Sequence, residues 1–194
     1  MELHSKERFK KHVITDIAIS KVQRIAYKGL TDEQNTDLQK LAQMVLLISQ
    51  QTNDSNEVAL TVSLHDKNLL GNAGVAVGDE HGVNICSETK SNHIIASAKD
   101  VSVAIVHNHP STQTLYIEDI GFFLYYTTVK ILAVVTNQGA VHYIMKDADY
   151  DYKAAEKLRQ ECVEDLTADS SAKEYYEAAL DFLAHCSEAG LYYR

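Results

Sequence analysis

Two histidines and one aspartate have the residue types and the spacing to hold a metal ion. His107 and His109 flank Asn108 at the end of an apolar run, directly before Pro110, which is the single proline of the chain. Because side chains alternate faces along an extended segment, both imidazoles point to the same side. Asp119 follows ten residues after His109 and can complete a set of three ligands. Three protein ligands with an open fourth position are typical of catalytic zinc rather than structural zinc.

The elements around these residues must bring the three side chains together. Residues 101–106 are almost all apolar, so we expect a strand buried on both faces that ends at the histidines. A helix expected over residues 117–129 places Asp119 in its first turn, where the helix dipole favours a carboxylate. A second buried strand is expected over residues 131–136, followed by a hairpin to residues 141–145. Strands that alternate with helices predict an α/β fold with a mixed β-sheet flanked by helices.

Three parts follow one another along the chain. We expect an N-terminal helical extension over residues 1–52, a core over residues 53–148 and a C-terminal helical extension over residues 149–194. Hydrophobic periodicity and turn residues predict three further elements in the core: a strand over residues 57–65, a short strand over residues 83–86 and a helix over residues 91–99.

The two flanking parts have helical patterns. In the first, these apolar residues recur near a period of 3.6: Phe9, Val13, Ile17 and Ile25. Thr31 and Gln34 then fit a capping box at the start of a second helix. In the C-terminal part we expect helices over residues 152–166 and 172–189, the second closed by Gly190.

The composition excludes several classes of protein. A hydrophobic content of 45% excludes a disordered chain, and no apolar run reaches the roughly 18 residues that span a bilayer. The charged N-terminus lacks the apolar region of a signal peptide, so we expect a cytoplasmic protein. A net charge of −9 argues against tight binding to nucleic acid. Three widely spaced cysteines predict free thiols rather than disulfides or a zinc site.

The core resembles the JAMM (MPN-type) zinc metalloprotease superfamily, and more closely its RadC-like JAB-domain branch. That family has a glutamate, a long gap, the sequence His-x-His-Pro and then Ser-x-x-Asp. The matching residues here are Glu57, His107, His109, Pro110 and Asp119. The resemblance covers about residues 57–145, and the flanking helices lie outside it.

This resemblance implies a cytidine-deaminase-like α/β core that holds one zinc ion through His107, His109 and Asp119. Glu57 would be the general base in the hydrolysis of a peptide or isopeptide amide bond, so a protein or peptide would be the substrate. The sequence departs from the family at one catalytic position, because Tyr116 stands where the family has the serine that supplies a hydroxyl to the oxyanion. The spacing from histidine to aspartate is also one residue shorter. Tyr116 or Ser111 would then have to supply the hydroxyl.

Other interpretations stay open at this point. Glu80 and Glu88 are weaker candidates for the base, and Asp119 could simply cap a helix. A metal-dependent nuclease also fits a His-Asn-His sequence, although the acidic net charge opposes it. A non-catalytic MPN-like interaction or assembly module, of the kind found in phage or mobile-element proteins, is favoured by Tyr116. In that case the flanking helices could form the interface of a homo-oligomer.

Overall fold

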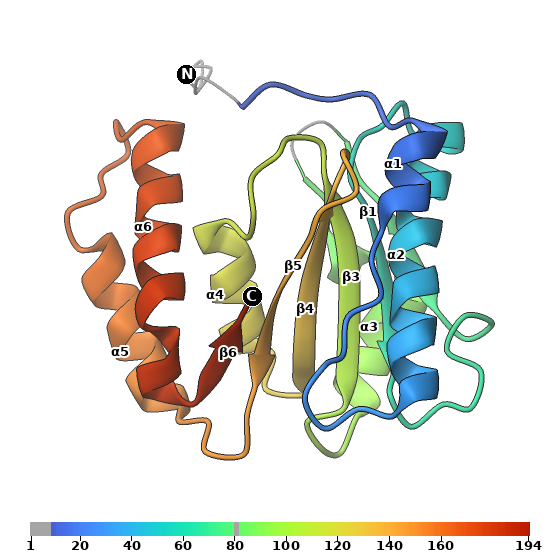
Figure 1. The fold of residues 1–194 in the computed structure, drawn as a ribbon. Helices are drawn as coiled ribbons and strands as arrows, with labels where there is room; N and C mark the ends of the chain where they lie inside the picture. The colour runs from blue at the N-terminus through green and yellow to red at the C-terminus, as the bar shows by residue number, and fades with distance from the viewer. Residues whose placement is uncertain (1–8, 80–81) are drawn as a thin grey trace.

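A mixed β-sheet forms the centre of the part of the chain that the structure describes (Figure 1). The computed structural model describes residues 9–79 and 82–194. The strands in this part are β1 (Val58–Ser63), β2 (Gly74–Val77), β3 (Val103–His109), β4 (Val129–Thr136), β5 (Val141–Lys146) and β6 (Leu191–Tyr193). They form one six-stranded sheet in the order β2-β1-β3-β4-β5-β6. Strands β3 and β4 are parallel, and the other neighbouring pairs are antiparallel.

Helices cover both faces of this sheet (Figure 1). One face carries α1 (Asp16–Lys21) and α2 (Asp32–Thr52). The other face carries α3 (Thr89–Ser97), α4 (Ile117–Tyr125), α5 (Tyr152–Val163) and α6 (Ala172–His185). Two short 3-10 turns, η1 (Ile85–Ser87) and η2 (Cys186–Ala189), complete the elements. The predicted α/β class, with a mixed sheet flanked by helices, is confirmed.

Strand β3 runs through the middle of the sheet and separates two hydrophobic cores. All seven of its residues are buried. Val103 and Ile105 pack into the core beneath α4, whereas Ala104 and Val106 pack into the core beneath α2. The same alternation continues to the end of the strand, so the two histidines face α4 and Asn108 faces α2. The sequence predicted this strand to end before the histidines, but they belong to it.

The predicted helix through Phe9, Val13, Ile17 and Ile25 is wrong. Only the six residues of α1 are helical in that stretch, and residues 9–15 form neither helix nor strand. Val13 and Ile17 are 75% and 65% exposed, so their apolar spacing does not mark a buried face. The backbone of this segment bonds to a distant part of the chain instead, since the N–H of His12 donates to the carbonyl of Pro110 at 2.7 Å.

Two other elements differ from the prediction. Residues 83–86 do not form a strand, because the side chain of Asn84 accepts a hydrogen bond from the N–H of Ser87 at 3.2 Å and closes the turn η1. Helix α4 ends at Tyr125 rather than near residue 129, since the chain must enter β4 at Val129, where that residue pairs with Val103.

Local signals correctly predicted the start of α2 and the position of Gly190, whereas α5 and α6 end at Val163 and His185, before the expected residues 166 and 189. The predicted capping box is present: Thr31 Oγ1 accepts from the N–H of Gln34 at 3.2 Å, and Gln34 Oε1 accepts from the N–H of Thr31 at 2.9 Å. The C-terminal part contains α5 and α6, and Gly190 follows η2 with a φ of 69°. Strand β6, which was not expected, then adds to β5 at the edge of the sheet. The boundaries of the three predicted parts stay a prediction.

Two further expectations concern the described residues. Within them, no helix has both the length and the apolar character that crossing a membrane requires. The three cysteines are free, as predicted; Cys186 is buried, and Cys86 and Cys162 are half-buried.

Candidate metal centre

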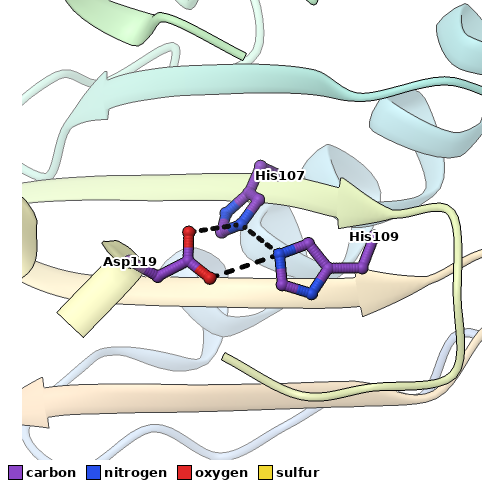
Figure 2. A group of neighbouring side chains, drawn as sticks. All are labelled: His107, His109 and Asp119. Carbon is purple, nitrogen blue, oxygen red and sulfur yellow. Dashed lines mark hydrogen bonds and ion pairs between the residues drawn. The ribbon is translucent and has the colours of Figure 1, made fainter. Parts of the chain in front are cut away.

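Three side chains from β3 and α4 converge at the carboxyl end of β3 (Figure 2). His107 and His109 are the last buried residues on the α4 side of that strand, and they are 2% and 1% exposed. Asp119 lies in the first turn of α4. The structure therefore brings together the three residues that the sequence predicted as ligands, and the group can hold a metal ion.

The donor atoms of these three side chains face one another. Nε2 of His107 lies 3.0 Å from Nε2 of His109. The two carboxylate oxygens of Asp119 each lie 3.3 Å from one of these nitrogens, Oδ1 from His107 and Oδ2 from His109. Two imidazole nitrogens at this separation need a proton or a cation between them, because two lone pairs would repel each other.

Neighbouring groups orient two of the ligands. Nδ1 of His109 lies 3.4 Å from the carbonyl of Gln113, so a proton on Nδ1 leaves the lone pair of Nε2 free to bind a metal. The carboxylate of Asp119 accepts a hydrogen bond from the N–H of Tyr116 at 2.7 Å. Within the described residues, Nδ1 of His107 is buried without a hydrogen-bond partner. Hydrogen bonds such as those that Gln113 and Tyr116 form with His109 and Asp119 fix the orientation of metal ligands.

Charge attraction within the group outweighs the effect of burial. Burial opposes the ionisation of Asp119, but His107 and His109 hold the pKa of its carboxyl well below the usual range. Burial also opposes the protonation of His109, but Asp119 raises the pKa of this imidazole above its ordinary value. The group therefore stabilises positive charge among its three side chains, which is the charge that a bound cation supplies.

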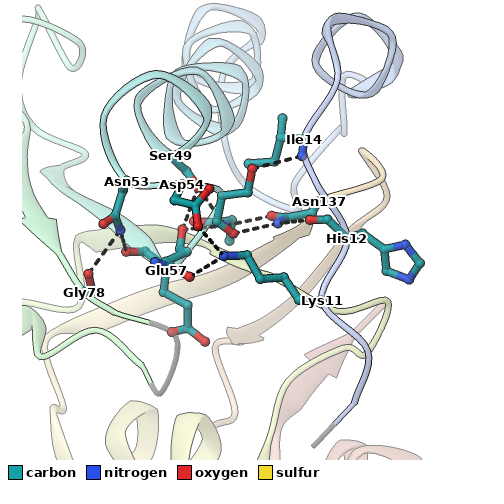
Figure 3. Close-up of polar contacts among 12 residues, drawn as sticks. Lys11, His12, Ile14, Ser49, Asn53, Asp54, Glu57, Gly78 and Asn137 are labelled. Carbon is teal, nitrogen blue, oxygen red and sulfur yellow. Dashed lines mark hydrogen bonds and ion pairs between the residues drawn. The ribbon is translucent and has the colours of Figure 1, made fainter.

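Glu57 lies at the same end of the sheet. It directly precedes β1, and Ala59 on that strand pairs with His107. Ala59 packs into the core beneath α4, so alternation along the strand directs Glu57 to the face that carries the histidines. Its backbone is fixed, since the carbonyl accepts a hydrogen bond from the side chain of Asn53 at 2.9 Å (Figure 3) and another from the N–H of Gly78 at 2.8 Å.

The carboxyl of Glu57 has a raised affinity for a proton. Burial raises its pKa, and the charges of His109 and His107 lower it by a smaller amount. The charges of both imidazoles therefore act on the carboxyl of Glu57. Glu57 does not belong to the group of converging donor atoms, which among the described residues contains the two histidines and Asp119.

The two predicted hydroxyl donors lie together. Ser111 Oγ and the hydroxyl of Tyr116 are 2.9 Å apart, and the ring of Tyr116 stacks on the imidazole of His109. Burial raises the pKa of Tyr116 to about 12, while the bond to Ser111 opposes this rise. The structure therefore places a pair of neutral hydroxyl groups beside one of the candidate ligands.

The other glutamates offered as bases have different positions. The carboxylate of Glu88 accepts hydrogen bonds from the N–H groups of Lys90 and Ser91, at 2.9 and 2.6 Å, and caps helix α3. Glu88 is thus occupied as a helix cap. Glu80 lies outside the described residues.

A buried asparagine pair holds the opposite side of β3. Asn108 accepts a hydrogen bond from the N–H of Val58 at 2.8 Å and donates to Oδ1 of Asn137 at 2.8 Å. Asn137 in turn donates to the carbonyl groups of His12 and Ser55, at 2.7 and 2.9 Å (Figure 3). This pair ties the end of β3 to the start of β1 and to the N-terminal segment.

The sequence did not single out Asn137, although a signal for it exists. Asn137 directly follows the buried strand β4 and carries a side-chain amide. Strand β4 is parallel to β3. Because parallel strands end at the same edge of a sheet, a polar residue directly after β4 must lie beside the histidines. Its N–H donates to the carbonyl of His109 at 3.0 Å.

No protein-family model matches the chain, and searches of curated proteins and of solved structures found no match. Function is therefore inferred from the geometry of the site.

Proposed function

We propose that the chain is a zinc-dependent hydrolase of peptide or isopeptide amide bonds, with a RadC-like core of the JAMM type. One observation carries the proposal: His107, His109 and Asp119 converge beneath α4, and Glu57 lies at the same end of the sheet on the same face. A cytidine-deaminase-like core and a protein or peptide substrate are parts of this proposal.

The donor set supports zinc as the metal. Two imidazole nitrogens and one carboxylate oxygen are ligands that zinc accepts in catalytic sites. Donor atoms around a tetrahedral zinc ion lie about 3.3 Å apart. The two imidazole nitrogens are 3.0 Å apart, and each lies 3.3 Å from a different oxygen of Asp119. A bound zinc ion would supply acidified water and polarise the carbonyl of the scissile amide.

Glu57 is the proposed base. It would take a proton from the attacking water and deliver it to the nitrogen of the leaving amine, so that the amide bond breaks without releasing an amide anion. Partial burial and a raised pKa suit a carboxylate that must hold a proton for part of the reaction. The adjacent strand β1 keeps its position fixed.

The Ser111–Tyr116 pair is the proposed hydroxyl source for the oxyanion. Either atom can donate in the bond between them, so one hydroxyl hydrogen remains free to point elsewhere. A donor of this type contributes about 100- to 1,000-fold to turnover in enzymes that use one. Ser111 is buried and Tyr116 is half-buried, which leaves Tyr116 on the solvent side of the pair.

Metal content tests the first part of the proposal. Elemental analysis of the purified protein should give about one zinc ion per chain, and the double variant His107→Ala/His109→Ala should give none. His65→Ala is a matched control, since this histidine pairs with Asp100 beyond the opposite end of β1. A wild-type protein that takes up no metal after zinc is added would overturn the proposal.

The variant Glu57→Gln tests the second part. It keeps the size of the side chain and removes the base, so we expect zinc to stay bound and hydrolysis of peptide and isopeptide substrates to stop. Loss of zinc from this variant would instead make Glu57 a ligand. A zinc-loaded wild-type protein that cleaves none of a broad substrate panel would point to the second candidate function.

A non-catalytic MPN-like interaction or assembly module is that second candidate. The position of Tyr116 favours it, because its ring is stacked on His109 and its hydroxyl is engaged by Ser111. In this case the metal would stabilise the fold, and Glu57→Gln would leave binding of a partner unchanged.

A further inference from the structure

Three aromatic rings meet beside the candidate metal centre. Phe9 stacks against Tyr116, with ring centroids 6.2 Å apart and planes at 13°. Tyr176 on α6 closes the group, with its centroid 5.3 Å from Phe9 and 5.9 Å from Tyr116, edge-on in both pairs. The ring of Tyr116 also stacks on His109. Phe9 therefore contacts a ring that itself contacts a candidate metal ligand.

Two of these rings are held independently of Phe9. The hydroxyl of Tyr116 is bonded to Ser111, and its ring is supported by His109. The hydroxyl of Tyr176 accepts a hydrogen bond from the N–H of Thr114 at 3.3 Å. We call the place that the ring of Phe9 occupies against Tyr116 and Tyr176 the aromatic box. Phe9 enters it from the N-terminal segment and contributes its ring alone, so removal of Phe9 leaves both walls in place.

The segment that carries Phe9 binds the protein as an extended peptide would. The N–H of His12 donates to the carbonyl of Pro110 at 2.7 Å, and the carbonyl of His12 accepts from Asn137 at 2.7 Å (Figure 3). The N–H of Ile14 donates to Ser55 Oγ at 3.1 Å. Main-chain contacts of this kind are how peptide-binding surfaces hold extended ligands, and pockets for side chains add specificity.

We propose that the aromatic box is a binding site for an aromatic side chain of a peptide, and that Phe9 is its internal occupant. All three rings are half-buried, so the box borders solvent and a ligand can reach it. Offset and edge-on pairs of aromatic rings contribute beyond the area that they bury, which favours phenylalanine or tyrosine over an aliphatic residue. The occupant lies one ring from His109, so the preferred substrates carry an aromatic residue near the bond that is cleaved.

The substrate preference rests on the proposed hydrolase, whereas occupation of the box does not require a metal. Phe9 is tethered to the same chain and competes at a high effective concentration, which short flexible linkers raise to about millimolar. Ligands added in solution therefore bind weakly while Phe9 is seated. Removal of its ring should raise their apparent affinity, because the fraction of protein with a free box increases.

The test is a titration of metal-free protein with N-acetyl-phenylalaninamide, followed by the NMR signals of the Tyr176 ring and the His109 imidazole. We expect Phe9→Ala to bind this compound at least about tenfold more tightly than wild type. Val13→Ala is the matched control, because Val13 lies in the same segment and is 75% exposed. It should bind like wild type. N-acetyl-leucinamide should bind Phe9→Ala several-fold more weakly than the aromatic compound does.

Equal affinities of Phe9→Ala and wild type would overturn the proposal, as would equal affinities of the two amides or an absence of shifts at Tyr176. The same titration in the presence of zinc tests the aromatic box separately from the proposed hydrolase. A tenfold effect of Phe9→Ala in a protein that never binds zinc supports the box and removes the hydrolase. A protein that binds zinc but shows no such effect of Phe9→Ala keeps the hydrolase proposal and removes the aromatic box.

Discussion

The ring of Tyr116 lies flat against the imidazole of His109, with centroids 4.5 Å apart and planes at 23°. The backbone N–H of Tyr116 donates to the carboxylate of Asp119 at 2.7 Å. One residue thus fixes the orientation of two of the three candidate ligands, one through its side chain and the other through its backbone.

Replacing Tyr116 should therefore weaken metal binding according to what is removed. Tyr116→Ala removes the stack, and we expect zinc affinity to fall about 10- to 100-fold, as for other groups that orient metal ligands. Tyr116→Phe keeps the ring and should stay within about threefold of wild type. Competition with a chelating dye measures both. Equal losses in the two variants would show that the hydroxyl, rather than the stack, orients His109.

Zinc should stabilise the folded protein, because the three ligands converge only in the native structure. At a free zinc concentration 100 times the dissociation constant, the free energy of unfolding should rise by about 2.7 kcal/mol. Urea denaturation with zinc and with a chelator measures the difference. His109→Ala should show no response to zinc, and a response equal to that of wild type would place the metal elsewhere.

Removal of Asn137 should destabilise the fold. It donates to two carbonyl groups and accepts from Asn108 in a fully buried position. Asn137→Ala leaves these partners unsatisfied, which should lower the free energy of unfolding by about 2 kcal/mol. Asn72→Ala, at an exposed loop position, should change it by less than about 0.5 kcal/mol. An Asn137→Ala effect as small as that of the control would contradict the role of the pair.

Lys146 should make stability depend on pH. Its Nζ is buried and donates to three backbone carbonyls at the end of α4, those of Phe123, Tyr126 and Thr127. Burial lowers the pKa of Lys146 from 10.5 to about 7. Between these two values the unfolded chain binds the additional proton, so the free energy of unfolding rises with pH by at most about 1.4 kcal/mol per pH unit.

Lys146→Met removes this dependence. Urea denaturation at about pH 7 and about pH 9 should show wild type gaining about 2 kcal/mol relative to Lys146→Met. The comparison cancels the tyrosine and cysteine groups that both proteins share. Parallel pH profiles would show that the three carbonyls keep the amine protonated in the folded state.

The sequence predicted those elements whose cause is local. The capping box of Thr31 and Gln34 began α2 at the expected place, and the nearly all-apolar run predicted that β3 is buried on both faces. Alternation along that strand also placed His107 and His109 on one face. Alternation therefore predicted the pair of histidines, whereas Asp119 was predicted from its place in the following helix and from the resemblance of the motif.

The sequence failed where distant contacts decide the structure. Phe9 and Val13 had a helical spacing, yet residues 9–14 form no helix. Pro110 and Asn137 bind the backbone of His12, and Ser55 binds the N–H of Ile14, from elsewhere in the chain. The aromatic box was missed for the same reason. Its members Phe9, Tyr116 and Tyr176 are far apart in sequence, and no local pattern relates them.

The contact between His12 and Asn137 joins residues that are 125 positions apart. A ribosome makes His12 long before it makes its partner, so the N-terminal segment cannot dock during most of synthesis. The core strands that precede Asn137 can pair first, and closing so long a loop makes this docking step late and slow. Because Tyr176 is made later still, the aromatic box is completed only after Asn137 is available to bind the N-terminal segment.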